Sequence, residues 1–289
     1  MKVAVIGATG QLGADVCAAF ERAGHHVLPL THADIEIAEE ASVAAVLGEA
    51  KADVVVNTAA LHNVEQCEKV PLQAFAVNAV GARNLARACE ARGAYLLHIS
   101  TDYVFDGDKA APYVETDRPS PLNVYGVSKL AGEHFITSAC RSGAVLRVSG
   151  VYGSHACRAK GGLNFVRLML KLAKERPEIR VVDDEILTPT YAVDIAEEIV
   201  VMAEHRAVGL FHGTAQGACS WYEFARHIFE FSGIKTNLQK ARSGEFPAKV
   251  ARPSYSVLEN SRLKFHDLDI MPPWQDGLKR YLGEISALQ

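Results

Sequence analysis

The chain opens on Val3-Ala4-Val5-Ile6-Gly7-Ala8-Thr9-Gly10-Gln11-Leu12-Gly13, a short apolar run followed by a glycine turn and the start of a helical pattern. This order suits a pyrophosphate site, because the first turn of a helix presents free N–H groups and a positive dipole end to an anion. In the GxxGxxG spacing, Gly7 allows the sharp turn, Gly10 lets the backbone approach the phosphates, and Gly13 permits close packing of helix on strand. The stretch predicts a dinucleotide-binding site; the alternative is a turn with only a structural role.

Short β-branched runs alternate with helical patterns beyond this turn. The runs are mostly apolar throughout, as in parallel strands that helices cover on both faces. We expect strands at 2–6, 26–30, 53–58, 95–100, 144–148 and 179–182, and helices at 12–23, 42–50, 71–92, 125–140 and 164–176. This alternation predicts the α/β class, with a Rossmann-type doubly wound parallel sheet.

The regular alternation thins after about residue 150, where proline and glycine separate shorter elements. We expect residues 1–150 to form a dinucleotide-binding domain and residues 151–289 a smaller C-terminal substrate lobe. The two parts interleave, because 180–183 has the pattern of a core strand and 191–205 that of a helix packing back on the sheet.

Composition excludes several classes of function. The 289 residues carry 30 Lys and Arg against 34 Asp and Glu, interspersed, so no cationic stripe is available for nucleic acid. The N-terminal apolar run is too short for a signal peptide or a membrane span, so we expect a cytoplasmic protein without a membrane partner. The 6 cysteines lack CxxC pairs and the 11 histidines lack HExxH spacing, so we expect neither disulfides nor a metal site.

Weaker signals for the nucleotide follow the second and third strands. The second strand runs into Thr31-His32, so no acidic residue stands where an NAD site would hold the ribose, and no Arg marks an NADP site. Asp34-Ile35 either flank the adenine or form a turn. The small residues Ala59-Ala60 follow the third strand, where a cofactor would lie against the backbone. The sequence leaves NADPH and NADH both open.

Tyr125-Gly126-Val127-Ser128-Lys129 opens a helix after a proline-rich loop. Tyr125 and Lys129 are four positions apart, so both side chains project from the same helix face. The pair suits carbonyl reduction, because a phenol can protonate a developing alkoxide and a nearby ammonium lowers the phenol pKa from about 10 toward neutrality. The lysine can also hold the nicotinamide ribose. The alternative is a surface Tyr and Lys.

A second element supports the reactive pair. An upstream strand ends at Thr101-Asp102, and the carboxyl end of a strand is where an α/β sheet places its ligands. A hydroxyl there can hydrogen-bond a substrate carbonyl. Glu133, one turn beyond Lys129, is interpreted as a solvated helix charge.

Two stretches, Ser100-Thr101-Asp102-Tyr103-Val104-Phe105-Asp106-Gly107 and 121–133, closely resemble the dTDP-4-dehydrorhamnose reductase family, and the likeness extends along essentially the whole chain. The resemblance implies a catalytic triad of Thr101, Tyr125 and Lys129, with Thr101 in place of the more usual Ser. It also implies hydride transfer from NADPH or NADH to the C4 ketone of a nucleotide-linked 6-deoxy-hexose, which gives dTDP-L-rhamnose in the type enzymes.

The resemblance adds further contacts. It implies cofactor contacts from Gly10, Gln11, Leu12, Asp34, Ile35, Ala60, Leu61 and His62, and substrate contacts from Thr101 and Asp102. We also expect substrate contacts from Asn164, within the likeness, and from Arg252, in a late loop where it either binds a diphosphate or stands on the surface.

The chain departs from the family in the substrate lobe, with Gly150 where a Trp is usual and Leu187 where a Gly is common. The aromatic wall beside the sugar is therefore missing, and the identity of the sugar stays open. The alternatives are a reductase or epimerase-reductase of another sugar nucleotide, such as a GDP-linked one, and a non-catalytic NADP-binding regulatory subunit. A homodimer is one expectation for the assembly.

Overall fold

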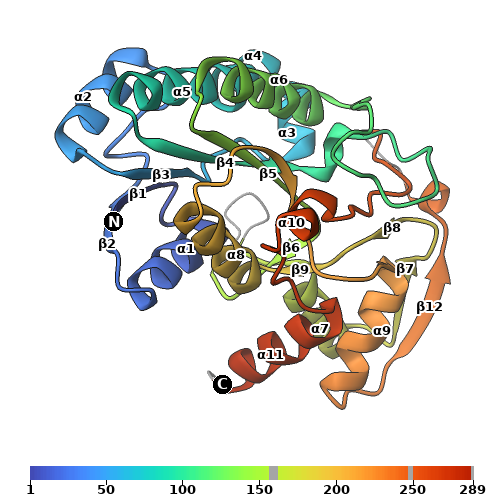
Figure 1. The fold of residues 1–289 in the computed structure, drawn as a ribbon. Helices are drawn as coiled ribbons and strands as arrows, with labels where there is room; N and C mark the ends of the chain where they lie inside the picture. Colours follow the sequence, from blue (N-terminus) through green and yellow to red (C-terminus); the bar gives the residue numbers. More distant parts are fainter. Residues whose placement is uncertain (156–161, 247–249, 288–289) are drawn as a thin grey trace.

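The computed structural model describes residues 1–155, 162–246 and 250–287. A six-stranded parallel sheet forms the centre of the larger lobe (Figure 1), in the order β10-β5-β4-β3-β1-β2. Its strands are β1 (Lys2–Ile6), β2 (His26–Leu30), β3 (Val54–Asn57), β4 (Tyr95–Thr101), β5 (Gly143–Val148) and β10 (Gly209–His212). The strand order reverses between β1 and β3, which is where such sheets bind ligands. The predicted fold class is confirmed.

Helices cover both faces of this sheet (Figure 1). They are α1 (Gln11–Arg22) and α8 (Ala192–Glu204) on one face, and α2 (Glu40–Ala50), α5 (Gly81–Arg92) and α6 (Val124–Ala139) on the other. Successive residues of β1 belong to two different cores: Val3 and Val5 pack toward α1 and α8, whereas Ala4 and Ile6 pack toward α2 and α5. Burial on both faces explains why the strand sequences are apolar throughout.

The segment predicted as one helix over 71–92 is divided. After α3 (Val64–Lys69) come α4 (Pro71–Phe75), a π-helical turn at Ala76–Val80 and then α5. The wider turn lies against α6, where a Cβ on Gly132 would come within 2.4 Å of the Asn78 carbonyl oxygen. Backbone contact between two helices is a tertiary effect that periodicity does not report.

The second lobe is built from short strands and amphipathic helices. Its strands are β6 (Val151–Tyr152), β7 (Glu178–Val182), β8 (Ile186–Leu187), β9 (Thr190–Tyr191), β11 (Cys219–Ser220) and β12 (Asn237–Ala241), and its helices are α7 (Phe165–Glu175), α9 (Trp221–Phe231) and α11 (Trp274–Ala287). The short helix α10 (Ser261–Phe265) lies instead against β10, and its Leu263 belongs to the core of the main sheet. Aromatic side chains, among them Tyr152, Phe224, Trp274 and Tyr281, form the core of the second lobe. The aromatic residues of α9 therefore serve packing.

The prediction that 180–183 is a strand of the core sheet was wrong. β7 pairs with β12 in a separate two-stranded sheet, and the edge of the main sheet next to β5 is taken by β10, which the sequence analysis missed. In β7 Ile179 and Val181 are buried while Arg180 is exposed, the alternation of a strand covered on one face only. α8 lies beside α1 and shares its hydrophobic core (Figure 1).

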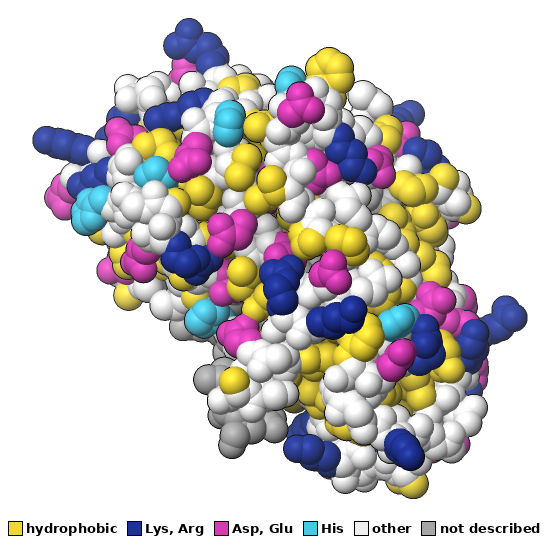
Figure 2. Space-filling model, turned by 60° about the horizontal axis from the view of Figure 1, so that its bottom comes forward, with side chains coloured by type: hydrophobic (Ala, Val, Ile, Leu, Met, Phe, Trp, Pro, Cys, Tyr) yellow, Lys and Arg dark blue, Asp and Glu magenta, His cyan; other side chains and the backbone are white. Residues whose placement is uncertain are grey.

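The surface gives no sign of a single-charge patch on the side that Figure 2 shows, where positive and negative side chains are mixed. Among the described residues, no helix combines the length and the apolar character that a bilayer span would need.

Candidate active site

The glycine turn joins β1 to α1 with almost no free space. Gly7 has φ +81° and donates its N–H to the Leu30 carbonyl at 2.9 Å. A Cβ on Gly13 would lie 2.2 Å from the Gly7 carbonyl oxygen, and one on Gly7 would lie 2.8 Å from Thr58 Oγ1. Gly10 stands at the N-cap of α1 and no side chain of the described chain caps that end, so its first N–H groups point outward, ready for an anion.

The segment after β3 lies directly against this turn, because β3 is the neighbour of β1. A Cβ on Gly7 would come within 3.0 Å of the Ala59 backbone nitrogen. Leu61 is held through its backbone: its N–H donates to Asn78 Oδ1 at 2.9 Å and its carbonyl accepts from Asn78 Nδ2 at 3.0 Å. The structure thus brings the 59–62 segment, whose other predicted members are Ala60 and His62, to the same edge of the sheet as the glycine turn. Gln11 and Leu12 open the helix beside it.

The two residues expected at the adenine form a turn in this structure. The Asp34 carboxylate accepts from the Thr31 N–H at 2.8 Å and from its hydroxyl at 2.7 Å, and these bonds hold the Asp34 pKa below its usual range. Ile35 is buried in the core beside α5. The Ile35 side chain therefore packs in the core, and a cofactor contact from it stays a prediction.

Tyr125 is brought to the end of β4 by the way α6 begins. Asn123 caps the helix, accepting from the Gly126 N–H at 2.9 Å and donating to the Ala251 carbonyl at 3.0 Å. A Cβ on Gly126 would lie 2.2 Å from the Tyr103 carbonyl oxygen, so the helix start is pressed on the turn after β4. Thr101 lies close enough to the Tyr125 phenol to lower the Tyr125 pKa, against the larger rise that burial causes. Two of the three predicted catalytic side chains are therefore neighbours.

Asp102 supports Thr101 from inside the protein. The Thr101 hydroxyl donates to Asp102 Oδ1 at 3.0 Å, and the Ser149 hydroxyl donates to Asp102 Oδ2 at 2.8 Å. The carboxylate is buried, which raises its pKa. Asp102 thus orients the Thr101 hydroxyl from inside the protein, and a substrate contact from Asp102 stays a prediction.

Lys129 lies below the tyrosine with its amine turned toward β4. Nζ donates to the Ile99 carbonyl at 2.6 Å and lies 3.1 Å from His98 Nε2. The expectation that its charge brings the Tyr125 pKa toward neutrality does not hold for this arrangement. Burial of the phenol raises the Tyr125 pKa, and the nearby Asp102 charge adds to the rise.

A chain of direct contacts nevertheless joins Lys129 to the glycine turn. Gly7 abuts Ala59, whose N–H donates to Asn57 Oδ1 at 3.1 Å. Asn57 Nδ2 is 2.9 Å from His98 Nδ1, and the other nitrogen of that ring meets Lys129. The predicted nucleotide end and the predicted reacting end therefore belong to one site.

Glu133 is not the solvated charge that the sequence suggested. It forms a buried ion pair with Arg147, with Nη2–Oε2 at 2.6 Å and Nε–Oε1 at 2.8 Å, and accepts from the Ser100 hydroxyl at 2.5 Å. The pair ties α6 to β4 and β5, and so fixes the helix that carries Tyr125 and Lys129. The sequence does not reveal that Arg147 of β5 lies opposite Glu133, so the carboxylate could not be recognised as a buried ion-pair partner.

Two later predicted residues, Asn164 and Arg252, make contacts within the chain. Asn164 is buried and caps α7, accepting from the Arg167 N–H at 2.9 Å and donating to Gly153 and Tyr281 oxygens at 2.7 and 2.8 Å. Both Nδ2 protons and one lone pair of Oδ1 are used within the chain, so Asn164 has a structural role here, and a substrate contact from it stays a prediction. Arg252 is half exposed and pairs with Glu65 at 2.6 Å.

The two departures from the family pattern meet in space. Gly150 has φ +57°, and a Cβ on it would lie 2.7 Å from the Thr188 carbonyl oxygen and 3.0 Å from Leu187 Cδ1. Leu187 thus packs over the position where a side chain of residue 150 would start. The two departures are therefore neighbours in the structure.

Sequence reasoning missed two polar residues that support the site. Asn78 is buried in the π-helical turn and donates to Ser128 Oγ at 3.0 Å as well as to Leu61, while Ser128 donates to the Tyr125 carbonyl at 2.8 Å. Asn78 therefore links the 59–62 segment to α6. The available signal was an Asn within an otherwise apolar helical stretch.

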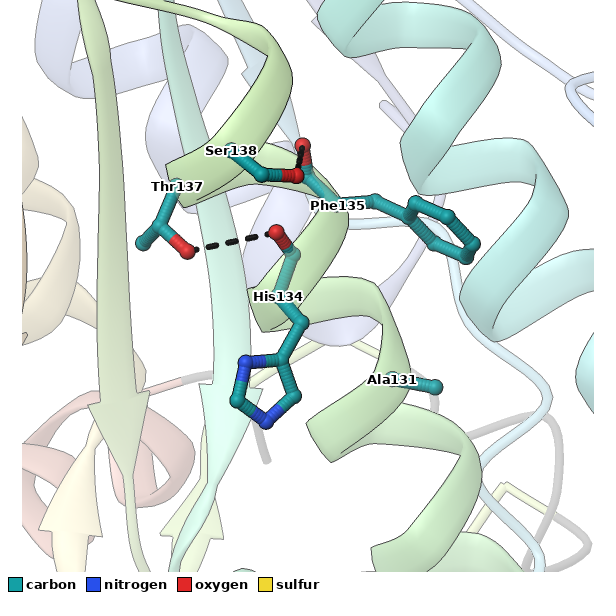
Figure 3. A pocket seen from close by; sticks show the side chains of 5 residues that line it. All are labelled: Ala131, His134, Phe135, Thr137 and Ser138. Carbon is teal, nitrogen blue, oxygen red and sulfur yellow. Dashed lines mark hydrogen bonds between the residues drawn. The ribbon is translucent and has the colours of Figure 1, made fainter.

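The open hollow in Figure 3 is a different place. Its lining comes from successive turns of α6, and the Thr137 and Ser138 hydroxyls there donate to helix carbonyls. None of the predicted site residues lines it.

Comparison with known proteins agrees with this geometry. The family model described as RmlD substrate binding domain matches residues 1–287. The spore coat polysaccharide biosynthesis protein SpsK of Bacillus subtilis is 41% identical over 287 residues, covering 99% of this chain and 98% of that protein. A dTDP-4-dehydrorhamnose reductase of Mycobacterium tuberculosis is 36% identical over 288 residues, covering 98% of this chain and 92% of that protein.

Solved structures extend the comparison. A dTDP-4-dehydrorhamnose reductase of Clostridium acetobutylicum superimposes with a TM-score of 0.94 at 37% identity, covering 99% of this chain and 100% of that one. The enzyme of the same name from Bacillus anthracis, solved in complex with NADP, gives a TM-score of 0.93 at 37% identity, covering 98% and 99%. The resemblance inferred from the sequence is confirmed, and the chain belongs to the dTDP-4-dehydrorhamnose reductase family.

Proposed function

We propose that this protein reduces the C4 ketone of a nucleotide-linked 6-deoxy-hexose with NADPH or NADH, as a dTDP-4-dehydrorhamnose reductase in dTDP-L-rhamnose biosynthesis. One observation carries the proposal: Tyr125 and Thr101 are neighbours at the carboxyl end of β4, and a series of contacts through His98, Asn57 and Ala59 links Lys129 to the glycine turn. Full-length relatives carrying the name of this reductase support it.

The residues of the glycine turn fit a dinucleotide. A Cβ at Gly7 or Gly13 would fill the space against Thr58 and the turn, and the uncapped start of α1 offers N–H groups to a pyrophosphate. When bound, NADPH or NADH supplies the hydride. In the proposal Gly10, Gln11 and Leu12 hold the phosphates. The backbone of the 59–62 segment lies along the cofactor, and Asp34 stands beyond it.

Tyr125 acts as the acid in this proposal. Its high pKa keeps the phenol protonated at neutral pH, so a proton is available when negative charge develops on the ketone oxygen. Thr101 carries a single hydroxyl proton, which is directed at Asp102, so it can polarise the ketone only by turning that proton outward. Lys129 orients the nicotinamide ribose.

The two parts of the chain divide the ligands between them in this proposal. Residues 1–150 hold the cofactor, and residues 151–289 hold the sugar nucleotide, with Arg252 at its diphosphate. Packing of Leu187 over Gly150 favours a second candidate, a reductase of another sugar nucleotide, because it removes an aromatic surface from beside the sugar.

The test is NADPH oxidation with dTDP-4-keto-6-deoxyhexose, run beside GDP-linked and UDP-linked 4-keto sugars. Tyr125→Phe should lower kcat by about 10²–10⁴-fold, the usual contribution of a general acid, while the NADPH Kd stays within about twofold. Tyr222→Phe, in the second lobe, is the control and should match the unaltered protein. Turnover retained by Tyr125→Phe would refute the acid, and NADPH oxidation with none of the sugars would refute the reductase.

Assembly and location complete the proposal. We propose a homodimer, because Leu72, Val80 and Val127 expose apolar side chains on the neighbouring elements α4, the π-helical turn and α6. Light scattering after size exclusion would decide it. We propose the cytoplasm as location. The cysteines at 17, 67, 89, 140 and 219 are free thiols, which suits a reducing compartment.

A further inference from the structure

Three buried polar side chains form a line beneath the candidate active site. Asn57 at the end of β3 and His98 in β4 are register partners, and Lys129 reaches them from α6. Their exposures are 1%, 1% and 2%. Asn57 Nδ2 is 2.9 Å from His98 Nδ1, and His98 Nε2 is 3.1 Å from Lys129 Nζ. A buried line of this kind must have a consistent direction of proton donation.

The direction is fixed at the Asn57 end. The Ala59 backbone N–H, which can only donate, is 3.1 Å from Asn57 Oδ1. The amide oxygen is therefore on that side, and the NH₂ group faces His98. Because an amide NH₂ only donates, His98 Nδ1 must accept, and the proton of the neutral ring is on Nε2.

The donor direction determines which protonation state of Lys129 fits. His98 Nε2–H is a donor aimed at Nζ, so the 3.1 Å contact is a hydrogen bond only if the amine offers a lone pair. A neutral amine satisfies every partner: it accepts from His98 and donates to the Ile99 carbonyl at 2.6 Å. An ammonium in the same place would set two donors against each other.

The direction of the pKa shifts agrees with this picture. Burial lowers the Lys129 pKa to about 8 and lowers the His98 pKa well below its ordinary value, so each group gives up its proton more readily than it would in water. The charge that opposes the fall is Glu133 on the same helix, and Arg147 of β5 neutralises it in a buried pair. Among the described groups facing the line, β3 contributes the uncharged Asn57, β4 the neutral His98, and α6 the protonated Tyr125.

We propose that Asn57 and His98 are positioning residues that favour the neutral amine of Lys129 while it lies against His98, so that the neutral lysine takes up one proton from solvent when it leaves His98 to pair with the ribose. The inference rests on the proposed function for the role of the ribose, but the donor direction is a property of the chain itself. No electrons move, and the proton gained by Nζ is the only change in bonding.

The direct test is the protonation state of the ring in the unaltered protein. In chain labelled with ¹⁵N-histidine, NMR should show His98 with its proton on Nε2 and no titration across the pH range in which the fold persists. His98→Gln identifies the signal. A proton on Nδ1, or a titrating imidazolium, would overturn the proposal.

The second test is the titration of Lys129, followed by ¹³C-lysine NMR. In His98→Gln the new amide can turn its oxygen toward an ammonium, so the midpoint for Lys129 should rise by about one pH unit. The basic limb of the kcat profile should move with it. His134→Gln, on the exposed side of α6, is the matched control and should leave both unchanged. An unmoved Lys129 midpoint in His98→Gln would refute the positioning role.

Two provisions keep the tests decisive. If His98→Gln does not fold, Lys129→Met identifies the His98 signal, because that signal shifts when the neighbouring amine is removed. The tautomer of His98 in the unaltered protein then tests the proposal. Neither NMR reading requires turnover, so a protein that fails to reduce any sugar nucleotide would refute the proposed function and leave this inference standing.

Discussion

Glu198 is a buried carboxyl in α8, far from the reacting groups along the chain, and it gives the protein a measurable dependence of stability on pH. Its side chain has no exposure, and Oε2 accepts the Ile270 N–H at 3.0 Å, while Oε1 has no hydrogen-bond partner in the part of the chain described. Burial, with a smaller contribution from Asp269, raises the Glu198 pKa from 4.5 to about 7.

The sign and size of the effect follow from this pKa. A raised pKa means that the folded protein favours the protonated form, so stability is fully present below the unfolded value of 4.5 and falls as pH rises to about 7. Above that pH the loss is constant. A shift of this size corresponds to about 3 kcal/mol, or roughly 6 °C in Tm for a chain of this length.

Glu198→Gln should remove that dependence, because the amide keeps an acceptor for Ile270 and carries no charge. Urea unfolding at about pH 5 and about pH 8 measures it: the unaltered protein should lose roughly 3 kcal/mol more than the variant between the two. Glu197→Gln, its exposed neighbour in an ion pair with Arg22, is the control and should follow the unaltered protein. If Glu198→Gln loses stability with pH as the unaltered protein does, the buried carboxyl is not the cause.

Three further outcomes are expected. Gly13→Ala would put a Cβ 2.2 Å from a carbonyl oxygen of the glycine turn and should weaken NADPH binding at least about tenfold by calorimetry, whereas Gly283→Ala, with open space around it, should not. Glu133→Gln should cost about 3 kcal/mol or more in urea unfolding by leaving a buried guanidinium without its charge partner, against under ~1 kcal/mol for the exposed Glu230→Gln; equal costs would contradict the buried pair. Asn123→Ala removes the cap of α6 and should cost about 1–2 kcal/mol, with kcat falling as Tyr125 loses its fixed position; unchanged stability would exclude the cap.

Local sequence was enough where the physics is local. The glycine turn was predictable because its main requirements are local: Gly7 has φ +81°, and a Cβ on Gly13 would lie 2.2 Å from the Gly7 carbonyl oxygen. The strands β1, β3, β4 and β5 were predictable because burial on both faces favours mostly apolar residues. The edge strand β2 is partly exposed but is apolar over most of its length. The shared helix face of Tyr125 and Lys129 follows from helical geometry alone.

What the sequence could not reveal depended on the neighbour across a contact. The strand at 180–183 pairs with β12 and not with the main sheet. Glu133 forms an ion pair with Arg147, and Asn164 caps α7. In each case the residue type was compatible with two roles.

The sequence determines the spacing of Tyr125 and Lys129 on one helix face, whereas the protonation state of the lysine depends on tertiary structure. Its partner His98 comes from a strand about thirty residues earlier, and the direction of that contact is set by Asn57 from a third element. Helical periodicity acts over one or two turns and determines which side chains lie on the same face of a helix. Donor direction and burial arise only when distant segments pack together, because they depend on which polar groups are left for each atom to bond.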